Sequence, residues 1–181
     1  MGKSLPPGIS SSKARPSRPE AEARLRAIAQ QNAIQTLKAA IHPAELYLVG
    51  GSVRDAFLTT ADTDLDVATS ITAQEVKERC SAHGIRIIET GIQHGTVLAL
   101  IDDIHIEVTT FRVPSSRDAH TTARDIRTDL SGRDFTINAI AFDIATSTII
   151  DPFNGVADIE NGLLRGVVDA EARLIEDPLR I

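Results

Sequence analysis

LYLVGGSVRDAFLTTADTDLDVAT, residues 46–69, joins an apolar run, a glycine pair, a helical pattern and two aspartates. The run Leu46–Val49 predicts a strand, Gly50 and Gly51 a tight turn, and Ser52–Leu58 a helix. Glycine allows close approach of another group, and the helix offers unpaired N–H groups at the positive end of its dipole. Such a turn can bind phosphate, although a glycine pair after a strand is more often a turn alone.

Two aspartates follow this turn in alternation with apolar residues. In Asp64-Leu65-Asp66-Val67, a strand would place both carboxylates on one face and Leu65 and Val67 on the other, in the core. Two carboxylates on one face suit Mg²⁺, which prefers oxygen ligands. A lone Asp-x-Asp is commonly a solvated strand edge, so the metal interpretation rests on the order of turn and aspartates.

Composition places the chain among ordinary globular proteins. It has 181 residues, of which 42% are hydrophobic and 24% charged, and no apolar run approaches the roughly 18 residues needed to span a bilayer, so we expect no membrane partner. The net charge of −6 argues against a chain-wide electrostatic grip on nucleic acid. Cys80 is the one cysteine, which excludes an intrachain disulfide and indicates a reducing, cytoplasmic location. We interpret it as a small core residue on a helix.

The sequence predicts one main domain behind an N-terminal extension. Residues 1–19 are rich in proline and serine and contain no acidic residue, which is typical of a disordered leader. Glu20–Ile41 predicts one helix, ended by His42-Pro43 and packed as an appendage. The expected division is a leader over 1–19, a helical segment over 20–44 and a head domain over 45–181.

The rest of the sequence predicts two helices and a larger number of strands. A helix over Thr72–His83 starts with a capping box, Thr72 with Glu75, and stops at Gly84. A short helix over Gly155–Leu164 is expected to leave Asp158 exposed. The predicted strands are Ile85–Glu89, Thr96–Ile101, Ile104–Thr110, Ala139–Ile144, Thr148–Asp151 and Val167-Val168. We expect an α/β fold with a mixed, mostly antiparallel sheet of about five strands and helices against one face.

One of these predicted strands contains a carboxylate at its centre. Glu107 stands between the apolar residues Ile106 and Val108. A carboxylate at mid-strand is costly to bury unpaired, so it either faces water or meets a cation. If its strand lay antiparallel beside that of Asp64 and Asp66, the second interpretation would be favoured.

Seven motifs in this order carry a family resemblance. Together they resemble the head domain of class II tRNA nucleotidyltransferases (CCA-adding enzymes) and bacterial poly(A) polymerases, members of the polymerase-β nucleotidyltransferase superfamily. The resemblance covers about residues 45–181. The motifs are LVGGSVRD (48–55), DLD (64–66), GIQHGTV (91–97), EVTTFR (107–112), GRDFTINA (132–139), DPFNG (151–155) and EDPLR (176–180).

The resemblance implies template-independent addition of C and A, from CTP and ATP, to a tRNA 3′ end. It implies that Asp64 and Asp66 hold two Mg²⁺ ions and that Glu107 supplies a third carboxylate. Poly(A) synthesis is an alternative. CC-only addition is another, because the segment between Arg112 and Arg133 is shorter than is common in the family. A non-catalytic nucleotide- or RNA-binding module is the alternative from another class.

The resemblance also implies the residues that contact the nucleotide. Gly50, Gly51 and Arg54 match positions that contact the triphosphate, and Arg133 matches a further nucleotide-binding arginine. For Arg54 an ion pair with the neighbouring Asp55 is the structural alternative.

Base selection is implied for the motif at the C-terminal end. Cytosine and adenine each present an amine donor beside a ring-nitrogen acceptor, whereas uracil and guanine present the reverse. An acceptor at Asp177 beside a donor at Arg180 would therefore accept C and A and reject U and G. Family members continue beyond this motif with domains that grip tRNA. We therefore expect residues 1–181 to be a fragment with weak or absent activity, and the sequence leaves the oligomeric state open.

Overall fold

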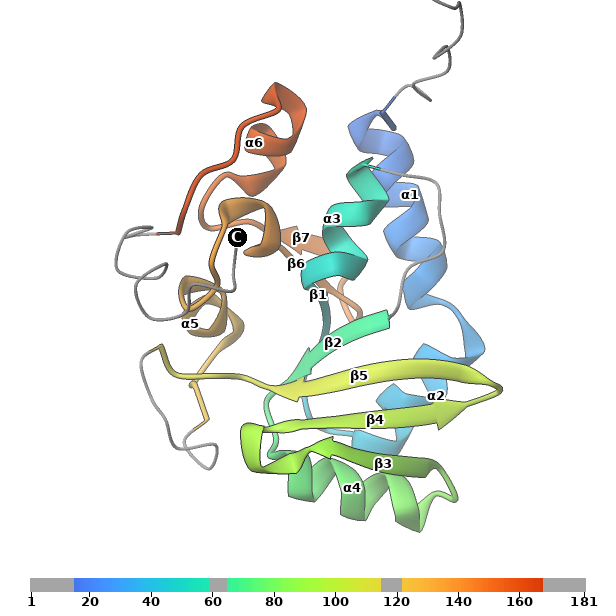
Figure 1. Cartoon of the computed structure of the whole chain (residues 1–181). Coiled ribbons are helices and arrows are strands. Elements are labelled where there is room, and N and C mark those ends of the chain that lie inside the picture. Colours follow the sequence, from blue (N-terminus) through green and yellow to red (C-terminus); the bar gives the residue numbers. More distant parts are fainter. Residues whose placement is uncertain (1–14, 59–64, 115–121, 168–181) are drawn as a thin grey trace, which may run out of the picture.

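The computed structural model describes residues 15–58, 65–114 and 122–167, which form one sheet with helices packed on it (Figure 1). Two short 3₁₀ helices, η1 and η2, join the regular elements. In chain order these are α1 (Arg18–Ala29), α2 (Asn32–Ile41), β1 (Leu46–Val49), α3 (Gly50–Leu58), β2 (Leu65–Thr69), α4 (Ala73–Ala82), β3 (Arg86–Gly91), η1 (Ile92–His94), β4 (Thr96–Ile101), β5 (Ile104–Thr110), α5 (Ile126–Ser131), η2 (Thr136–Asn138), β6 (Ala141–Asp143), β7 (Thr148–Ile150) and α6 (Gly155–Asn161).

The sheet has the strand order β3-β4-β5-β2-β1-β6-β7. Its neighbouring strands are antiparallel except β2 and β5, which are parallel. The predicted mixed, mostly antiparallel sheet is confirmed, but with seven strands in place of about five. The count rises because the β6–β7 hairpin continues the same sheet beyond β1.

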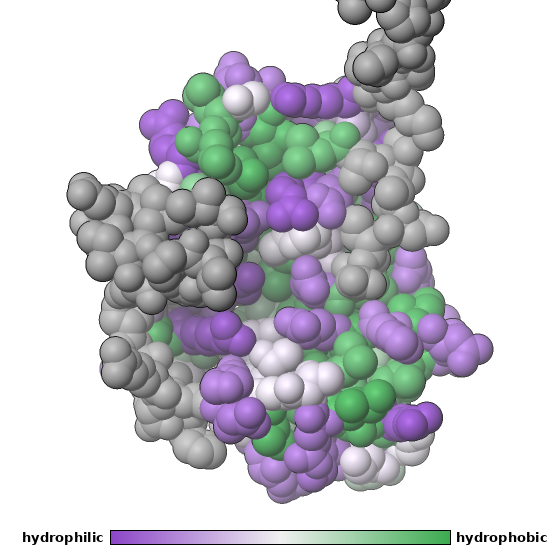
Figure 2. Space-filling model, in the orientation of Figure 1, coloured by the Kyte–Doolittle hydropathy of each residue, from purple (hydrophilic) through white to green (hydrophobic). Residues whose placement is uncertain are grey.

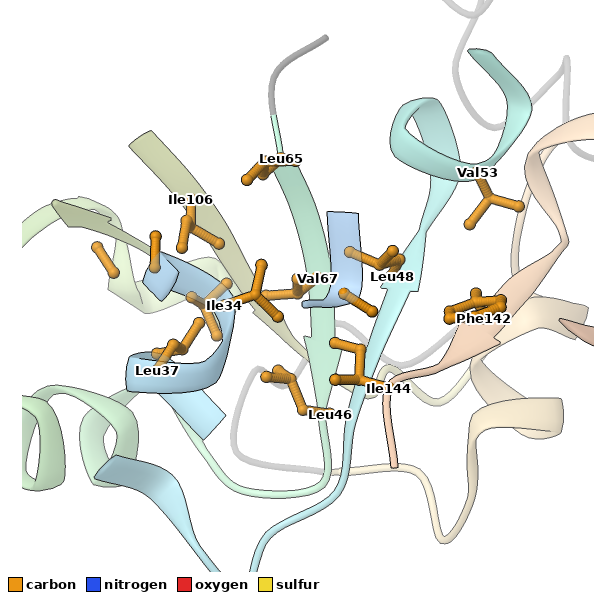
Figure 3. Close-up of a cluster of buried hydrophobic side chains, with 14 of the residues drawn as sticks. Ile34, Leu37, Leu46, Leu48, Val53, Leu65, Val67, Ile106, Phe142 and Ile144 are labelled. Carbon is orange, nitrogen blue, oxygen red and sulfur yellow. The ribbon is translucent and has the colours of Figure 1, made fainter. Parts of the chain in front are cut away.

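One face of the sheet carries the main core. Apolar residues at alternate strand positions point to this face and meet α1, α2, α3, α4 and α6. Figure 3 shows Ile34 and Leu37 of α2 directed toward Val67 of β2 and Ile106 of β5. The opposite face carries a smaller apolar cluster around Phe111 and α5. Helices therefore lie on both faces, although the prediction placed them on one.

The N-terminal helical segment differs from its prediction in two ways. The expected helix over Glu20–Ile41 is broken at Gln30 and Gln31, where Gln31 has an extended ψ of 142°. The break lets α1 pack against α3 while α2 packs against α4. The segment is also no appendage, since Leu25 and Ile34 are fully buried in the main core.

Several local predictions are confirmed. Thr72 caps α4 through a capping box with Glu75, and Gly84 follows the helix at φ +73°. Cys80 lies fully buried on α4, and burial raises the pKa of its thiol to about 11. The hairpin between β4 and β5 turns at Asp102 and Asp103, both with positive φ. The predicted strand over Val167-Val168 is not confirmed: an isolated bridge joins Phe135 to Gly166, Val167 is not in a strand, and Val168 lies outside the described residues.

The expected exposure of Asp158 is wrong. The residue is 4% exposed, because α6 packs this side against η2. Its Oδ2 accepts a hydrogen bond of 2.7 Å from the Thr136 hydroxyl, and its Oδ1 one of 3.2 Å from Arg165. These contacts fasten α6 to the segment that contains Arg133.

Asp158 should make the free energy of unfolding depend on pH in the acidic range. The Thr136 hydroxyl, with help from Arg165, lowers the pKa of the Asp158 carboxyl. Its stabilisation is therefore complete above the pKa of an unfolded aspartate, about 3.9, and is lost as pH falls through the lower folded pKa. In denaturant titrations between about pH 5 and pH 2, Asp158→Asn should lose less stability on acidification than the parent chain. Thr136→Val should flatten the profile in the same way; an unchanged profile in both variants would contradict this role.

Gly155 should tolerate no side chain. A Cβ atom there would lie 2.1 Å from the Thr136 carbonyl oxygen and 2.9 Å from Ile140 Cγ1. Neither group is the end of a flexible side chain, so Gly155→Ala should lower the free energy of unfolding by about 3 kcal/mol. Gly132→Ala is the milder comparison and should cost less, since Gly132 has an αR backbone and its Cβ would lie 3.3 Å from the Asp129 carbonyl oxygen, a tight contact that needs a shift of only a few tenths of an ångström. Denaturant unfolding of both variants measures the difference.

Candidate functional site

The glycine turn joins β1 directly to α3. Gly50 has φ +56°, a left-handed conformation that favours glycine, and α3 starts at this residue. Because β1 and β2 are antiparallel with Leu48 opposite Val67, the turn lies beside the start of β2. The predicted strand and helix are confirmed, but the helix begins at Gly50 rather than at Ser52, so the glycine pair forms its first turn. The first amides of α3 therefore lie at the end of the sheet.

Asp66 of β2 lies against this turn. A Cβ atom added to Gly51 would be 3.0 Å from Asp66 Oδ2, and one added to Gly50 would be 3.6 Å from the same oxygen. The backbone N–H of Asp66 donates a hydrogen bond of 2.6 Å to Oγ of the buried Ser52. The first turn of α3 and the Asp66 carboxylate are therefore held as one unit.

Glu107 stands next to Asp66 on the neighbouring strand. The two residues are register partners in the β2–β5 pair, so both side chains belong to the same face of the sheet, with strands about 4.8 Å apart. Leu65 and Val67 lie on the opposite face and are buried, as predicted. The two strands are parallel, whereas the condition stated from the sequence was an antiparallel pair. The adjacency holds all the same, since β2 reaches β5 through α4, β3 and β4. Asp64 lies outside the described residues.

Arg54 approaches the turn from α3. Its Nε donates to Asp55 Oδ1 at 2.7 Å, the ion pair that the sequence offered as the structural alternative, and its Nη1 donates to Asn138 Oδ1 at 2.9 Å. Its Nη2 lies 3.8 Å from the Cβ position of Gly51. These contacts hold the guanidinium in place and leave one of its nitrogens directed at the glycine turn.

Arg133 reaches the same turn from the segment after α5. Its Nη2 and Nε donate to Asp129 Oδ2 at 3.0 and 3.3 Å. Its Nη1 lies 3.5 Å from the Cβ position of Gly50. Two guanidinium groups that are far apart in the sequence therefore converge on the two glycines, beside the Asp66 carboxylate.

Three supporting residues were not singled out in the sequence. Ser52 bonds to the backbone of Asp66, Asn138 to Arg54, and Asp129 to Arg133. Asp129 had a detectable signal, because it precedes Arg133 by four positions and such pairs meet on one helical face. Ser52 and Asn138 had none, since their partners are distant in the sequence.

The site combines cationic and anionic groups in a way that suits a metal-bound polyphosphate. The guanidinium groups and the amides of α3 can bind phosphate oxygens. The neighbouring Asp66 and Glu107 carboxylates are oxygen ligands that fit a divalent cation such as Mg²⁺. Within the described ranges no cluster of three or more His, Cys, Asp or Glu side chains forms a metal site. Figure 2 shows the surface hollowed between the end with α3 and α6 and the end with β3, β4 and β5, with hydrophilic residues along the hollow.

Three of the nine sequence-predicted site residues cannot be placed with this group. Asp177 and Arg180 lie outside the described residues, as Asp64 does. Of the remaining six, Gly50, Gly51, Arg54, Asp66 and Arg133 are brought together around the turn, and Glu107 is beside Asp66.

In the part of the chain that the structure describes, no helix is long and apolar enough to cross a membrane.

Comparison with curated proteins identifies close relatives. The CCA-adding enzyme of Enterococcus faecalis is 45% identical over 143 residues, which are 76% of this chain and 34% of the relative. That of Lactiplantibacillus plantarum is 44% identical over 154 residues, 82% of this chain and 36% of the relative. The chain thus spans about a third of the length of these relatives.

Solved structures give the same result for the fold. Bacillus stearothermophilus CCA-adding enzyme in complex with CTP has a TM-score of 0.71 and 39% identity, covering 91% of this chain and 37% of that one. A tRNA nucleotidyltransferase complexed with a primer tRNA and an incoming ATP analog has a TM-score of 0.64 and 31% identity, covering 80% of this chain and 42% of that one. The family model of the poly A polymerase head domain matches residues 46–165, from β1 to just past α6. The chain therefore belongs to the poly A polymerase head domain family.

Proposed function

We propose that this chain carries the nucleotidyl-transfer site of an enzyme that adds C, and A, to tRNA 3′ ends. The observation that carries the proposal is the convergence of Arg54, Arg133 and Asp66 on the Gly50-Gly51 turn. Named relatives support it, since CCA-adding enzymes are 45% and 44% identical to this chain. So do related structures in complex with CTP, or with a primer tRNA and an ATP analog.

In this proposal the glycine turn and the arginines bind the triphosphate. Gly50 and Gly51 leave room for the phosphates to approach the backbone, while Arg54 and Arg133 neutralise their charge. The RNA 3′-hydroxyl attacks the α-phosphate and pyrophosphate leaves. Most of the rate enhancement then comes from holding hydroxyl and phosphate in line and from stabilising the charge on the phosphates.

The carboxylates complete the site by binding metal. Asp66 and Glu107, with Asp64 before them in sequence, would hold two Mg²⁺ ions. Bound divalent ions lower the pKa of an attacking hydroxyl and neutralise phosphate charge. Loss of product in an Asp64→Ala variant would support this ligand set, and retained product would refute it.

Base selection and RNA binding extend the proposal. Asp177 and Arg180 would read the Watson–Crick edge of C or A and exclude U and G. The net charge of −6 gives this chain little attraction for RNA, so other parts of the protein would hold the tRNA. We further propose a leader over 1–19, a helical segment over 20–44 and a head over 45–181, in a cytoplasmic protein.

The decisive experiment supplies tRNA that lacks its terminal CCA, together with Mg²⁺ and CTP or ATP, singly and in combination. It uses two proteins: residues 1–181 alone, and the full-length protein that their reading frame encodes. Growth by two residues with CTP alone and by three with both nucleotides would establish CCA addition. Growth that stops at two residues with both nucleotides would indicate CC addition, and long ATP tails poly(A) synthesis. Nucleotide or RNA binding without growth in either protein would favour a non-catalytic module.

A further inference from the structure

Asp129 is an almost completely buried carboxylate, and its contacts involve the candidate site. The residue is 3% exposed and lies on α5. Arg133 follows it by four residues, two residues beyond the end of that helix. Its Oδ2 accepts from both Nη2 and Nε of Arg133. This contact fixes the plane of the guanidinium, and the remaining nitrogen, Nη1, lies 3.5 Å from the Cβ position of Gly50.

The other oxygen of Asp129 is anchored to the chain that leaves β5. Oδ1 accepts a hydrogen bond of 2.8 Å from the backbone N–H of Arg112, two residues beyond the end of that strand. Glu107 belongs to the same strand. The carboxylate therefore has a fixed orientation of its own before it acts on Arg133, as a positioning group requires.

We propose that Asp129 is the positioning residue of the nucleotide site: its two oxygens tie Arg133 to the end of β5 and direct the arginine at the glycine turn. The proposal rests on the proposed function, because it assigns Arg133 to the triphosphate. It adds a residue that does not touch the nucleotide and acts through Arg133.

Charge and positioning predict opposite effects on nucleotide binding. Removing a carboxylate leaves the site more positive, so charge alone would strengthen binding of a triphosphate. Loss of the charge-assisted contact would release the guanidinium and weaken binding. Asp129→Asn separates the two, since its amide oxygen can still accept from the Arg112 N–H while its NH₂ group opposes the donors of Arg133.

The test measures the Kd of Mg-CTP and Mg-ATP by titration calorimetry on the full chain. Asp129→Asn should raise the Kd about tenfold, as expected for a lost charge-assisted contact. Asp125→Asn is the matched control: it removes the same charge from the N-cap of the same helix, and asparagine caps helices equally well. We expect its Kd to stay within about twofold of the parent value. In an Arg133→Ala background, Asp129→Asn should have no further effect, since the residue acts through that arginine.

A second readout does not depend on nucleotide. The Nε–H signal of Arg133 in ¹H–¹⁵N spectra, assigned by its loss in Arg133→Lys, should be protected from solvent exchange in the parent chain and exchange rapidly in Asp129→Asn. If Asp129→Asn proves unfolded, Arg133→Lys provides the test from the other side. Lysine keeps the charge but cannot make the two-nitrogen contact, so its Kd should rise to a similar extent.

The outcomes separate this proposal from the function on which it rests. If the parent chain binds neither nucleotide, the proposed function fails, and the Nε–H signal still decides whether Asp129 holds Arg133. If the parent chain binds but Asp129→Asn, or Arg133→Lys where that variant stands in, binds equally well or better, the positioning role is refuted. An additive loss in the Arg133→Ala background would also refute it, because the carboxylate would then act through β5.

Discussion

Replacing Asp66 with asparagine should reduce nucleotidyl transfer about a thousandfold while leaving the fold intact. Asp66 lies at the junction of the site: its carboxylate borders the Gly51 position at 3.0 Å and neighbours Glu107 across the β2–β5 pair. Asparagine preserves its shape and its backbone bond to Ser52, but an amide is a poor substitute for a carboxylate as a ligand of Mg²⁺. The loss should therefore fall on catalysis and metal affinity.

The measurement combines primer extension on tRNA lacking CCA with binding of Mn²⁺, a paramagnetic substitute for Mg²⁺. Activity is measured on the full-length protein that the reading frame encodes, and metal binding is measured on residues 1–181. Asp103→Asn is the matched control, because it makes the same change at a left-handed hairpin position that asparagine also adopts readily. Denaturant unfolding should show both variants within about 0.5 kcal/mol of the parent chain. Full activity in Asp66→Asn would refute the metal assignment.

The sequence predicts much of this site because its chemistry is local. Gly50, Gly51 and Asp66 occur in one segment, and the alternation around Asp66 is enough to assign its face of the strand. The pairing with Glu107 is different in kind. It depends on β5 lying beside β2 in the sheet. Whether β5 runs parallel or antiparallel to β2 is decided by the intervening elements α4, β3 and β4 rather than by any local sequence pattern.

Where prediction failed, tertiary packing had overridden the local signal. Asp158 looks like an exposed polar residue in a short helix, but a hydroxyl and a guanidinium from other segments make its burial favourable. The break between α1 and α2 has neither glycine nor proline to announce it. It exists because each helix packs against a different partner. Asn138 likewise acquires its role only when η2 is folded against α3.

Adding a methyl group at each glycine of the turn should separate activity from stability. Gly51 has a backbone that alanine can adopt, and alanine favours helix by about 1 kcal/mol, so Gly51→Ala should be at least as stable as the parent chain. Its Cβ, however, would lie 3.0 Å from Asp66 Oδ2. In the proposed function it would also occupy the space through which a phosphate approaches the turn. The carboxylate must shift by a few tenths of an ångström, roughly, and misplacement at a reacting centre is costly. We expect transfer activity to fall about a hundredfold.

Gly50→Ala should show the reverse pattern. Its φ of +56° makes alanine unfavourable by about 1 kcal/mol, so stability should fall. Its Cβ would meet Arg133 Nη1 at 3.5 Å and Asp66 Oδ2 at 3.6 Å, which are ordinary contact distances, so activity should fall less than in Gly51→Ala. Denaturant unfolding and primer extension on both variants give a two-by-two comparison. If the variant that loses more stability also loses more activity, the glycine turn has a structural role alone. If the two diverge as expected, the methyl group at position 51 acts on the carboxylate and the phosphate path, because the backbone there is unstrained.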